Sequence, residues 1–272
     1  MLRIAAGAFL KSNKNLLISK AGYVKCSDPR VAVVFSGCGV YDGSEIHEAV
    51  SILKHLTKNN VTPVAFGPDI AQHDVVNHLK GEVDPSHKRY VRVEAARIVR
   101  GNVQNICDLP KNVDCFDAVV FPGGFGVAKT LSDYATKGCE CTVIPEVAQV
   151  IEEFHRAQKL QAFACISPIL AARVLCNVTI TFGQNSCDKW PHRAAIDDAK
   201  KMGATVELRD WNEVSYDRKN RILSTPAYMY DGKYHEIDEG IGHMINYLVS
   251  LIKHGEVKNK EVCPPPDCKL EK

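Results

Sequence analysis

The chain has 272 residues, of which 45% are hydrophobic and 24% are charged, and this is the ordinary composition of a globular protein with a large core. Its formal net charge of +2 does not indicate a nucleic-acid or anionic-membrane surface, so we expect no nucleic-acid partner. No apolar run approaches the roughly 18 residues that a membrane span needs, which argues against membrane insertion.

Eleven cysteines are many for this length, but their spacing does not indicate a metal site. The sequence has neither a Cys-x-x-Cys pair nor cysteine and histidine pairs with the spacing of a zinc finger. The closest sets, Cys139 with Cys141 and Cys263 with Cys268, do not fit one either. We therefore expect no metal and no cofactor.

The first 27 residues are basic and contain no Asp or Glu. Arg3 and four lysines alternate with apolar side chains in an amphipathic mixture, which is typical of a mitochondrial presequence (transit peptide). The alternative is a disordered tail on a cytosolic protein. We predict a presequence at 1–27, one α/β domain at 28–254, a disordered polar tail at 255–272, and location in the mitochondrial matrix.

The segment from residue 31 to residue 66 predicts a strand–helix–strand unit. Residues 31–35 form a continuous apolar run, as in a strand buried on both faces. A glycine-punctuated loop follows, then Ser44 as a plausible N-cap, and a helix with apolar residues at helical spacing to about Lys58. A second strand covers 61–66. Such a unit implies a parallel sheet with a right-handed crossover.

The same alternation continues through the rest of the chain, with less regularity between 70 and 115. We expect strands at 117–121, 161–164, 206–208, 213–216 and 222–224, and helices at 75–79, 144–158, 193–202 and 237–252. Residues 90–99 fit a strand or a helix. The turn at 217–220 joins the last two strands in a hairpin. Alternating strands and helices predict a three-layer α/β sandwich around a mostly parallel sheet.

The strand at 161–164 runs directly into Cys165, and Pro168 follows within a sharp turn that opens a helix. A cysteine there lies at the end of a sheet with its sulfur near a helix N-terminus, where backbone N–H groups favour the thiolate. We therefore consider Cys165 a reactive thiol. The alternative is a small buried cysteine that fills a strand end.

Two other strand ends supply possible partners, because sites in open parallel sheets form beyond the carboxyl ends of the strands. Glu45 follows the first glycine loop and could hydrogen-bond the Cys165 sulfur as an acid/base, although it could equally be a first-turn carboxylate that complements the helix dipole. The N–H groups of Gly124 and Ile166 could form an oxyanion hole. The Gly123–Gly124 pair could also be a tight turn and nothing more.

Three histidines could serve as a general base or contact a substrate: His47 in the first helix, His78 in the irregular region, and His235 before the last helix. A single histidine is more often structural or solvated, so each assignment depends on where the fold places the ring.

These segments together closely resemble a known superfamily. The motifs are residues 36–48 (SGCGVYDGSEIHE), residues 122–126 (PGGFG) and residues 165–168 (CISP). They resemble the class I glutamine amidotransferase-like (PfpI) superfamily and, within it, the ElbB-type glyoxalase branch with its mitochondrial relatives. The resemblance covers about residues 30–253. It implies a flavodoxin-like sandwich, often dimeric, with Cys165 as nucleophile, Glu45 as its partner and Gly124 and Ile166 as oxyanion donors.

The chain also departs from the superfamily in ways that narrow its chemistry. Peptidase members have a histidine directly after the nucleophile, where this chain has Ile166, and glutaminases have a late His-x-Glu pair that His235 does not match. The chain therefore lacks the general base that peptidase and glutaminase activity each need. A Cys–Glu site suits a glyoxalase-like lyase that acts on 2-oxoaldehydes without glutathione.

Two other functions stay open. The first is a catalytically weak redox-responsive or interaction protein on the same fold, in which Cys165 oxidises. The second is nucleotide binding by Gly37, Gly39 and Gly43, whose spacing does not match the dinucleotide fingerprint.

Overall fold

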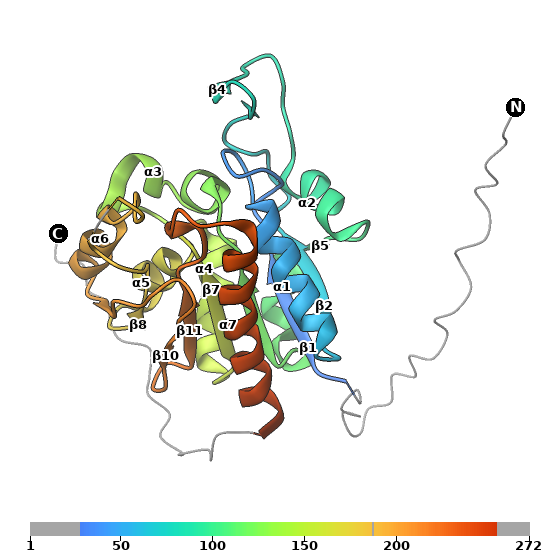
Figure 1. Ribbon diagram of the computed structural model, residues 1–272. Helices are drawn as coiled ribbons and strands as arrows, with labels where there is room; N and C mark the ends of the chain where they lie inside the picture. The colour runs from blue at the N-terminus through green and yellow to red at the C-terminus, as the bar shows by residue number, and fades with distance from the viewer. Residues whose placement is uncertain (1–27, 187, 255–272) are drawn as a thin grey trace, which may run out of the picture.

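The structure is a computed structural model that describes residues 28–254 except Cys187, so the predicted presequence and tail lie outside the described residues. Within that range no helix is long and apolar enough to cross a membrane. A seven-stranded sheet runs through the molecule in the order β10-β11-β7-β6-β1-β2-β5 (Figure 1). Its strands are β1 (Arg30–Val34), β2 (Thr62–Gly67), β5 (Gln104–Asn105), β6 (Ala118–Phe121), β7 (Leu160–Ala164), β10 (Ser215–Asp217) and β11 (Ile222–Thr225).

All neighbouring strands in this sheet are parallel except β10 and β11, which form the hairpin predicted from the turn at 217–220. The central strands β1, β6 and β7 are almost entirely buried, because helices cover both faces of the sheet. The predicted flavodoxin-like three-layer sandwich is confirmed.

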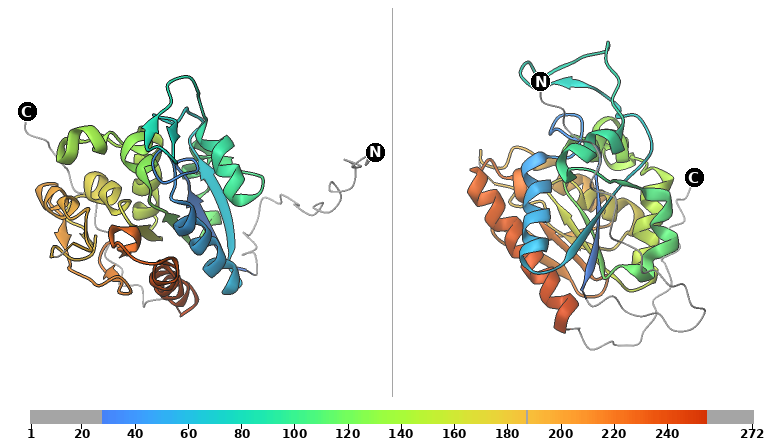
Figure 2. Two further views of the ribbon diagram at one scale, coloured as in Figure 1. Left: turned by 45° about the horizontal axis from the view of Figure 1, so that its top comes forward. Right: turned by 90° about the vertical axis from the view of Figure 1, so that its right-hand side faces the viewer.

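Helices α1 and α7 pack together on one face of the sheet, and α4 and α5 lie on the other, as the two views in Figure 2 show. The helices are α1 (Ile46–Lys58), α2 (Val91–Val99), α3 (Tyr134–Lys137), α4 (Pro145–Arg156), α5 (Pro168–Leu175), α6 (Ala194–Lys201) and α7 (Tyr234–His254). Single turns of 3₁₀ or π helix occupy Ile106–Asp108, Pro110–Cys115, Val127–Leu131, Gly138–Glu140 and Ala227–Met229.

The segment at 75–79, where we expected a helix, instead begins the small hairpin β3 (Val76–Asn77) and β4 (Glu82–Val83), which projects from the body (Figures 1 and 2). The Val76 N–H donates to the Asp42 carboxylate at 2.7 Å, and the Asn77 side chain accepts from the Leu79 N–H at 3.1 Å. These bonds hold the backbone extended and then turn it. A second small pair, β8 (Thr179–Ile180) and β9 (Thr205–Val206), lies beside β10 and β11.

The strand order places the carboxyl ends of β7, β6 and β1 side by side. The Cys165 turn, the glycine turn at 122–126 and the glycine loop at 36–43 follow these three ends in that order. They therefore share one edge of the sheet, as the sequence predicts for a parallel arrangement.

Candidate active site

Cys165 occupies the sharp turn between β7 and α5 in a left-handed backbone conformation, with φ = 61°. This conformation is uncommon for a residue with a side chain and costs free energy, so its surroundings must hold it. The Cys165 N–H donates to the Thr225 carbonyl at 3.1 Å, and the Ser167 hydroxyl donates to the carbonyls of Phe121 and Ala164, each at 2.8 Å. Three strand ends thus fix the turn and the direction of the thiol.

Glu48, in the first turn of α1, is the carboxyl that contacts this thiol. Its side chain is fully buried and hydrogen-bonds the Cys165 side chain. Each of its oxygens also accepts a backbone N–H, Oε2 from Gly123 at 2.8 Å and Oε1 from Tyr228 at 3.2 Å. The acid is therefore held rigidly beneath the sulfur by two loops.

Burial raises the pKa of both groups. The pKa of Glu48 rises to about 8, first because of burial and then because of the negative charge of Glu45. The pKa of the Cys165 thiol also rises well above its ordinary value, through burial and then through Glu48. The N–H groups of Gly124 and Ile166 point to the sulfur and lower its pKa, but burial outweighs them. Burial of the site therefore works against the thiolate that the helix N-terminus was expected to favour.

Gly123 is the residue whose small size makes this contact possible. A Cβ atom there would lie 2.4 Å from the Cys165 Cβ, 2.9 Å from its Sγ and 2.7 Å from the Glu48 Oε2. No side chain fits between the thiol and the carboxyl, so the glycine at the end of β6 is a steric requirement of the site.

Glu45 caps α1 instead of reaching the sulfur. Its Oε2 accepts the Glu48 N–H at 2.7 Å, and its Oε1 lies 2.9 Å from Nδ1 of His47. Ser44, which we expected as the cap, turns inward, and its hydroxyl accepts the Ser36 N–H at 2.9 Å. The cap therefore falls one residue later than expected, and the acid that faces the thiol is Glu48. A catalytic role for Glu45 stays a prediction; both of its carboxylate oxygens are bound at the start of α1, and no described hydrogen bond joins them to the thiol.

A pocket of about 310 Å³ opens above the thiol. Its described lining residues are Val40, Glu45, Gly124, Phe125, Ala128, Tyr134, Ala135, Cys165, Ile166, Pro191, His192, Ala194, Ala195, Tyr228 and Met229. The walls are mostly apolar, and the polar groups lie near the sulfur and at the rim. This is the usual construction of a small-molecule site.

None of the three histidines proposed as a base or substrate contact is among the described residues that line this pocket. His78 accepts the Tyr41 N–H at 3.2 Å and lies 3.0 Å from the Val76 carbonyl, so it stabilises the glycine loop. His235 is exposed at the start of α7. His47 stacks on Tyr234 at 4.5 Å and pairs with Glu45. The structure brings His192 to the pocket instead; the residue is exposed overall, and desolvation lowers its pKa.

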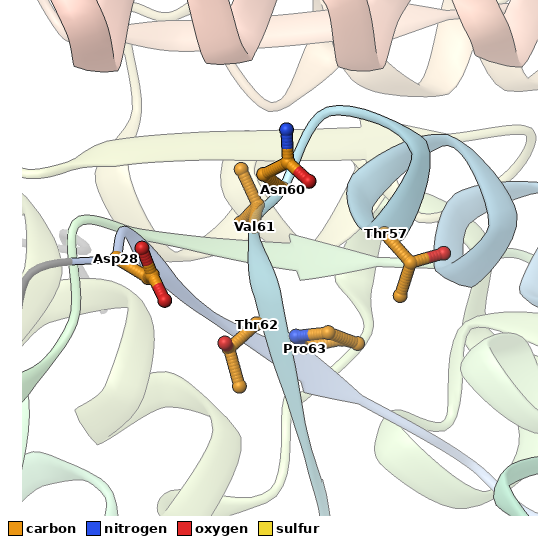
Figure 3. Close-up of a pocket in the computed structure, with 6 residues that line it drawn as sticks. All are labelled: Asp28, Thr57, Asn60, Val61, Thr62 and Pro63. Carbon is orange, nitrogen blue, oxygen red and sulfur yellow. The ribbon is translucent and has the colours of Figure 1, made fainter.

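A second hollow, of about 360 Å³, lies at the opposite end of the sheet (Figure 3). It is lined by Asp28, Thr57, Asn60, Val61, Thr62 and Pro63, where α1 ends and β1 and β2 begin. This lining contains no cysteine or histidine. Across residues 28–254 without Cys187, no group of three or more His, Cys, Asp or Glu side chains could hold a metal ion.

No family model matches the chain. Among curated proteins it is 40% identical over 255 residues to the ES1 protein homolog, mitochondrial, of Rattus norvegicus, covering 92% of this chain and 95% of that protein. It is 42% identical over 224 residues to the glutamine amidotransferase-like class 1 domain-containing protein 3, mitochondrial, of Homo sapiens, covering 82% and 83%. The chain belongs to this ES1 family. Like these relatives, it is a mitochondrial protein.

A solved structure supports the assignment of this ES1-family chain. The isoprenoid biosynthesis protein with amidotransferase-like domain from Ehrlichia chaffeensis superposes with a TM-score of 0.72 at 34% identity, covering 81% of this chain and 99% of that one. The glutamine amidotransferase-like fold is therefore shared along nearly the whole of the bacterial protein.

Glu48 is the main residue that sequence reasoning missed in this ES1-family chain, although the sequence carries a signal for it. On α1, Glu48 lies four residues before Ile52 and eight before Leu56, both fully buried. A carboxylate on the apolar stripe of an amphipathic helix indicates a buried acid. His192 and Tyr228 had no comparable signal, because loops far apart in the chain bring them to the pocket.

Proposed function

We propose that this ES1-family protein is a cysteine-dependent, glyoxalase-like lyase that converts small 2-oxoaldehydes into 2-hydroxy acids without glutathione. One observation supports this most directly: the Cys165 thiol hydrogen-bonds a buried Glu48 carboxyl whose pKa is raised to about 8. A group that titrates near the working pH can both accept and return a proton, as an acid/base catalyst must.

The first step would be addition of the thiol to the aldehyde. The sulfur forms a bond to the aldehyde carbon while the ionised Glu48 takes the thiol proton, and the former carbonyl oxygen takes the negative charge. The N–H groups of Gly124 and Ile166, which already point to the sulfur, are suited to stabilise that oxygen. Protonation of the oxygen gives a hemithioacetal.

The remaining steps need only proton transfers and one water molecule. Loss of the proton from the former aldehyde carbon and protonation of the neighbouring carbon turn the hemithioacetal into a 2-hydroxy thioester. In this proposal Glu48, which hydrogen-bonds the Cys165 side chain, shuttles these protons. Water then cleaves the thioester, which releases the 2-hydroxy acid and restores the thiol, so the reaction consumes no oxidant or reductant.

The alternative, a redox-responsive thiol, is less well supported. Oxidation to a sulfenic acid requires thiolate character and access to solvent. Burial and the neighbouring carboxyl raise the pKa of Cys165, and its residue exposure is 7%. Both properties slow oxidation, whereas a 2-oxoaldehyde is electrophilic enough to react as the proton moves to Glu48.

The assembly proposed from the family resemblance is a homodimer, and light scattering of the purified full chain tests it. A mass of one chain would contradict it.

The decisive experiment measures methylglyoxal consumption and lactate formation by the full chain without glutathione. We expect Cys165→Ala to reduce turnover at least about a thousandfold, since the covalent intermediates cannot form. Gly81→Ala is the matched control, because a Cβ atom there meets no atom within 4 Å. Turnover that survives in Cys165→Ala would refute the proposed mechanism.

A further inference from the structure

The pocket above Cys165 is lined by negative rather than positive charge. Glu45 is the only Asp, Glu, Lys or Arg among its described lining residues, and it is 6% exposed. Glu48 lies directly beneath the floor. A substrate that carries a carboxylate or phosphate would therefore meet an acidic side chain and no lysine or arginine to pair with.

The basic side chains around the pocket do not change this. Arg193, between the lining residues His192 and Ala194, is exposed and is not among the described lining residues. Lys129 lies over the Phe125 ring at 5.7 Å but is paired with Asp74 at 2.9 Å, and it is not part of the lining. His47 pairs with Glu45 and is 51% exposed, so it faces solvent rather than the pocket interior. His192 is exposed overall, and desolvation at the pocket lowers its pKa, which favours its uncharged form.

The remaining walls suit an uncharged, apolar group. Aliphatic side chains and three aromatic residues, Phe125, Tyr134 and Tyr228, surround the space. The volume of about 310 Å³ lies at the lower end of ordinary small-molecule pockets, at about 300 Å³, and is more than a three-carbon substrate needs. Aromatic walls also favour an aromatic ligand through edge and face contacts.

We propose that this pocket selects uncharged 2-oxoaldehydes with an apolar, preferably aromatic, side group and excludes anionic ligands, with Glu45 as the residue that sets this charge selection. This proposal rests on the proposed function for the reaction itself, but the charge selection is a property of the pocket alone. Anionic 2-oxo acids and phosphorylated aldehydes are therefore not its substrates.

The directions of the pKa shifts in the site agree with the negative charge of the pocket. Burial and neighbouring carboxyls raise the pKa values of Cys165, Glu48 and Tyr228, which lie on three different elements. Each shift means that one more negative charge is unfavourable there. An anionic ligand would add such a charge in the same space.

A test that does not depend on turnover compares two alkylating reagents that differ in charge. Iodoacetamide and iodoacetate react with the same sulfur, and mass spectrometry of the full chain follows the Cys165 and Cys107 peptides separately. Cys107 is exposed and serves as the internal reference. We expect the ratio of the iodoacetamide rate to the iodoacetate rate to be about tenfold higher at Cys165 than at Cys107, because the negative charge of the pocket repels the iodoacetate carboxylate. Equal preferences at the two cysteines would overturn the proposal.

A matched pair of variants assigns the effect to Glu45. Glu45→Gln keeps a side-chain oxygen that can cap α1 but removes the charge, and it should reduce the preference at Cys165 severalfold. Glu82→Gln, on the exposed strand β4, should leave it unchanged. A preference that Glu45→Gln does not alter would refute the role of Glu45.

A third measurement addresses the apolar side group. The kcat/KM for phenylglyoxal should exceed that for methylglyoxal about tenfold or more, the size of effect that an apolar pocket gives. A higher kcat/KM for methylglyoxal would overturn the proposed preference for an aromatic side group. Absence of turnover with both substrates would refute the proposed function, while the alkylation ratio would still decide the charge selection.

Discussion

The two ends of the central sheet carry hollows of similar size but very different chemistry. The hollow at the amino ends of the strands measures about 360 Å³, and the pocket at the carboxyl ends measures about 310 Å³. Around the first, Asp28 is the only titratable side chain among the described lining residues. Around the second, a strained cysteine, a buried acid and two inward-pointing N–H groups converge.

The difference follows from the direction of the strands and not from the space available. At the carboxyl ends the chain must turn sharply from strand to helix, and glycine turns there leave backbone N–H groups pointing into the opening. At the amino ends the chain enters the strands from helix ends, and the N–H groups of Asn60, Val61 and Thr62 donate to backbone carbonyls instead. If this is right, single substitutions should change activity when they are made at the carboxyl ends of the strands and not when they are made at the amino ends.

Apart from the loss of Cys165 itself, the largest effect should come from Glu48→Gln. The amide cannot take the thiol proton, so we expect the turnover of methylglyoxal to fall about 10² to 10⁴-fold, the usual contribution of an acid/base group. Asp28→Asn, at the other end of the sheet, should leave turnover unchanged. Equal losses in the two variants would remove the distinction between the two hollows.

Gly123→Ala should be the most destabilising change at the carboxyl end. The new methyl group would overlap the Cys165 and Glu48 side chains, so we expect a loss of about 1–3 kcal/mol in the free energy of unfolding and loss of activity. Gly81→Ala, with φ = 71° but open space around it, should cost about 1 kcal/mol through backbone strain and keep activity. Urea denaturation and the turnover assay separate these outcomes. Full activity in Gly123→Ala would contradict the close contact.

The stability of the protein should depend on pH through Glu48. Because its pKa is about 8 in the folded state and about 4.5 in the unfolded state, the folded state binds the extra proton between these values. Its stabilising effect is therefore complete below pH 4.5 and is lost as pH rises through 8. Relative to Glu48→Gln, the wild type should lose on the order of a few kcal/mol between pH 5 and 9. Urea unfolding at each pH gives the free energy of unfolding of the two proteins. If both free energies changed with pH in the same way across this range, the buried acid would be ruled out.

Glu45→Gln should give the smallest effect and tests how the two acids interact. The negative charge of Glu45 helps to raise the pKa of Glu48, so its removal should lower that pKa. We expect the pH at which Cys165 alkylation by iodoacetamide changes rate to move downward, while the fold stays intact because Gln keeps a capping oxygen. An unchanged pH would mean that the charge of Glu45 does not reach Glu48.

The sequence predicted most of this carboxyl end because long apolar runs define it. The continuous apolar stretches of β1, β6 and β7 fixed three strand ends, and parallel topology then placed Cys165, Gly124 and Ile166 together. The edge strand β5 escaped prediction, because it has two polar residues, Gln104 and Asn105, with no periodicity to detect.

The choice between two nearby acids depended on where α1 is capped. Ser44 is among the residue types favoured as helix caps and Glu45 is not, yet the cap falls on Glu45, and this shift of one residue leaves Glu48 to face the core. That choice depends on the inward hydrogen bond between Ser44 and Ser36, which forms only when the loop is folded. His192 reaches the pocket from the loop before α6, and no local pattern predicts that approach.

Glu48 accepts two backbone N–H groups, and this affects which residues relatives are expected to keep. Gly123 follows β6 and Tyr228 follows β11, so a single carboxyl on α1 joins two loops that would otherwise leave buried donors unpaired. Its removal would loosen the architecture as well as the chemistry. An inactive descendant could lose the cysteine and still be selected to keep the glutamate. Among ES1 homologues, we therefore expect the cysteine to vary with the proposed activity and the glutamate to persist with the scaffold.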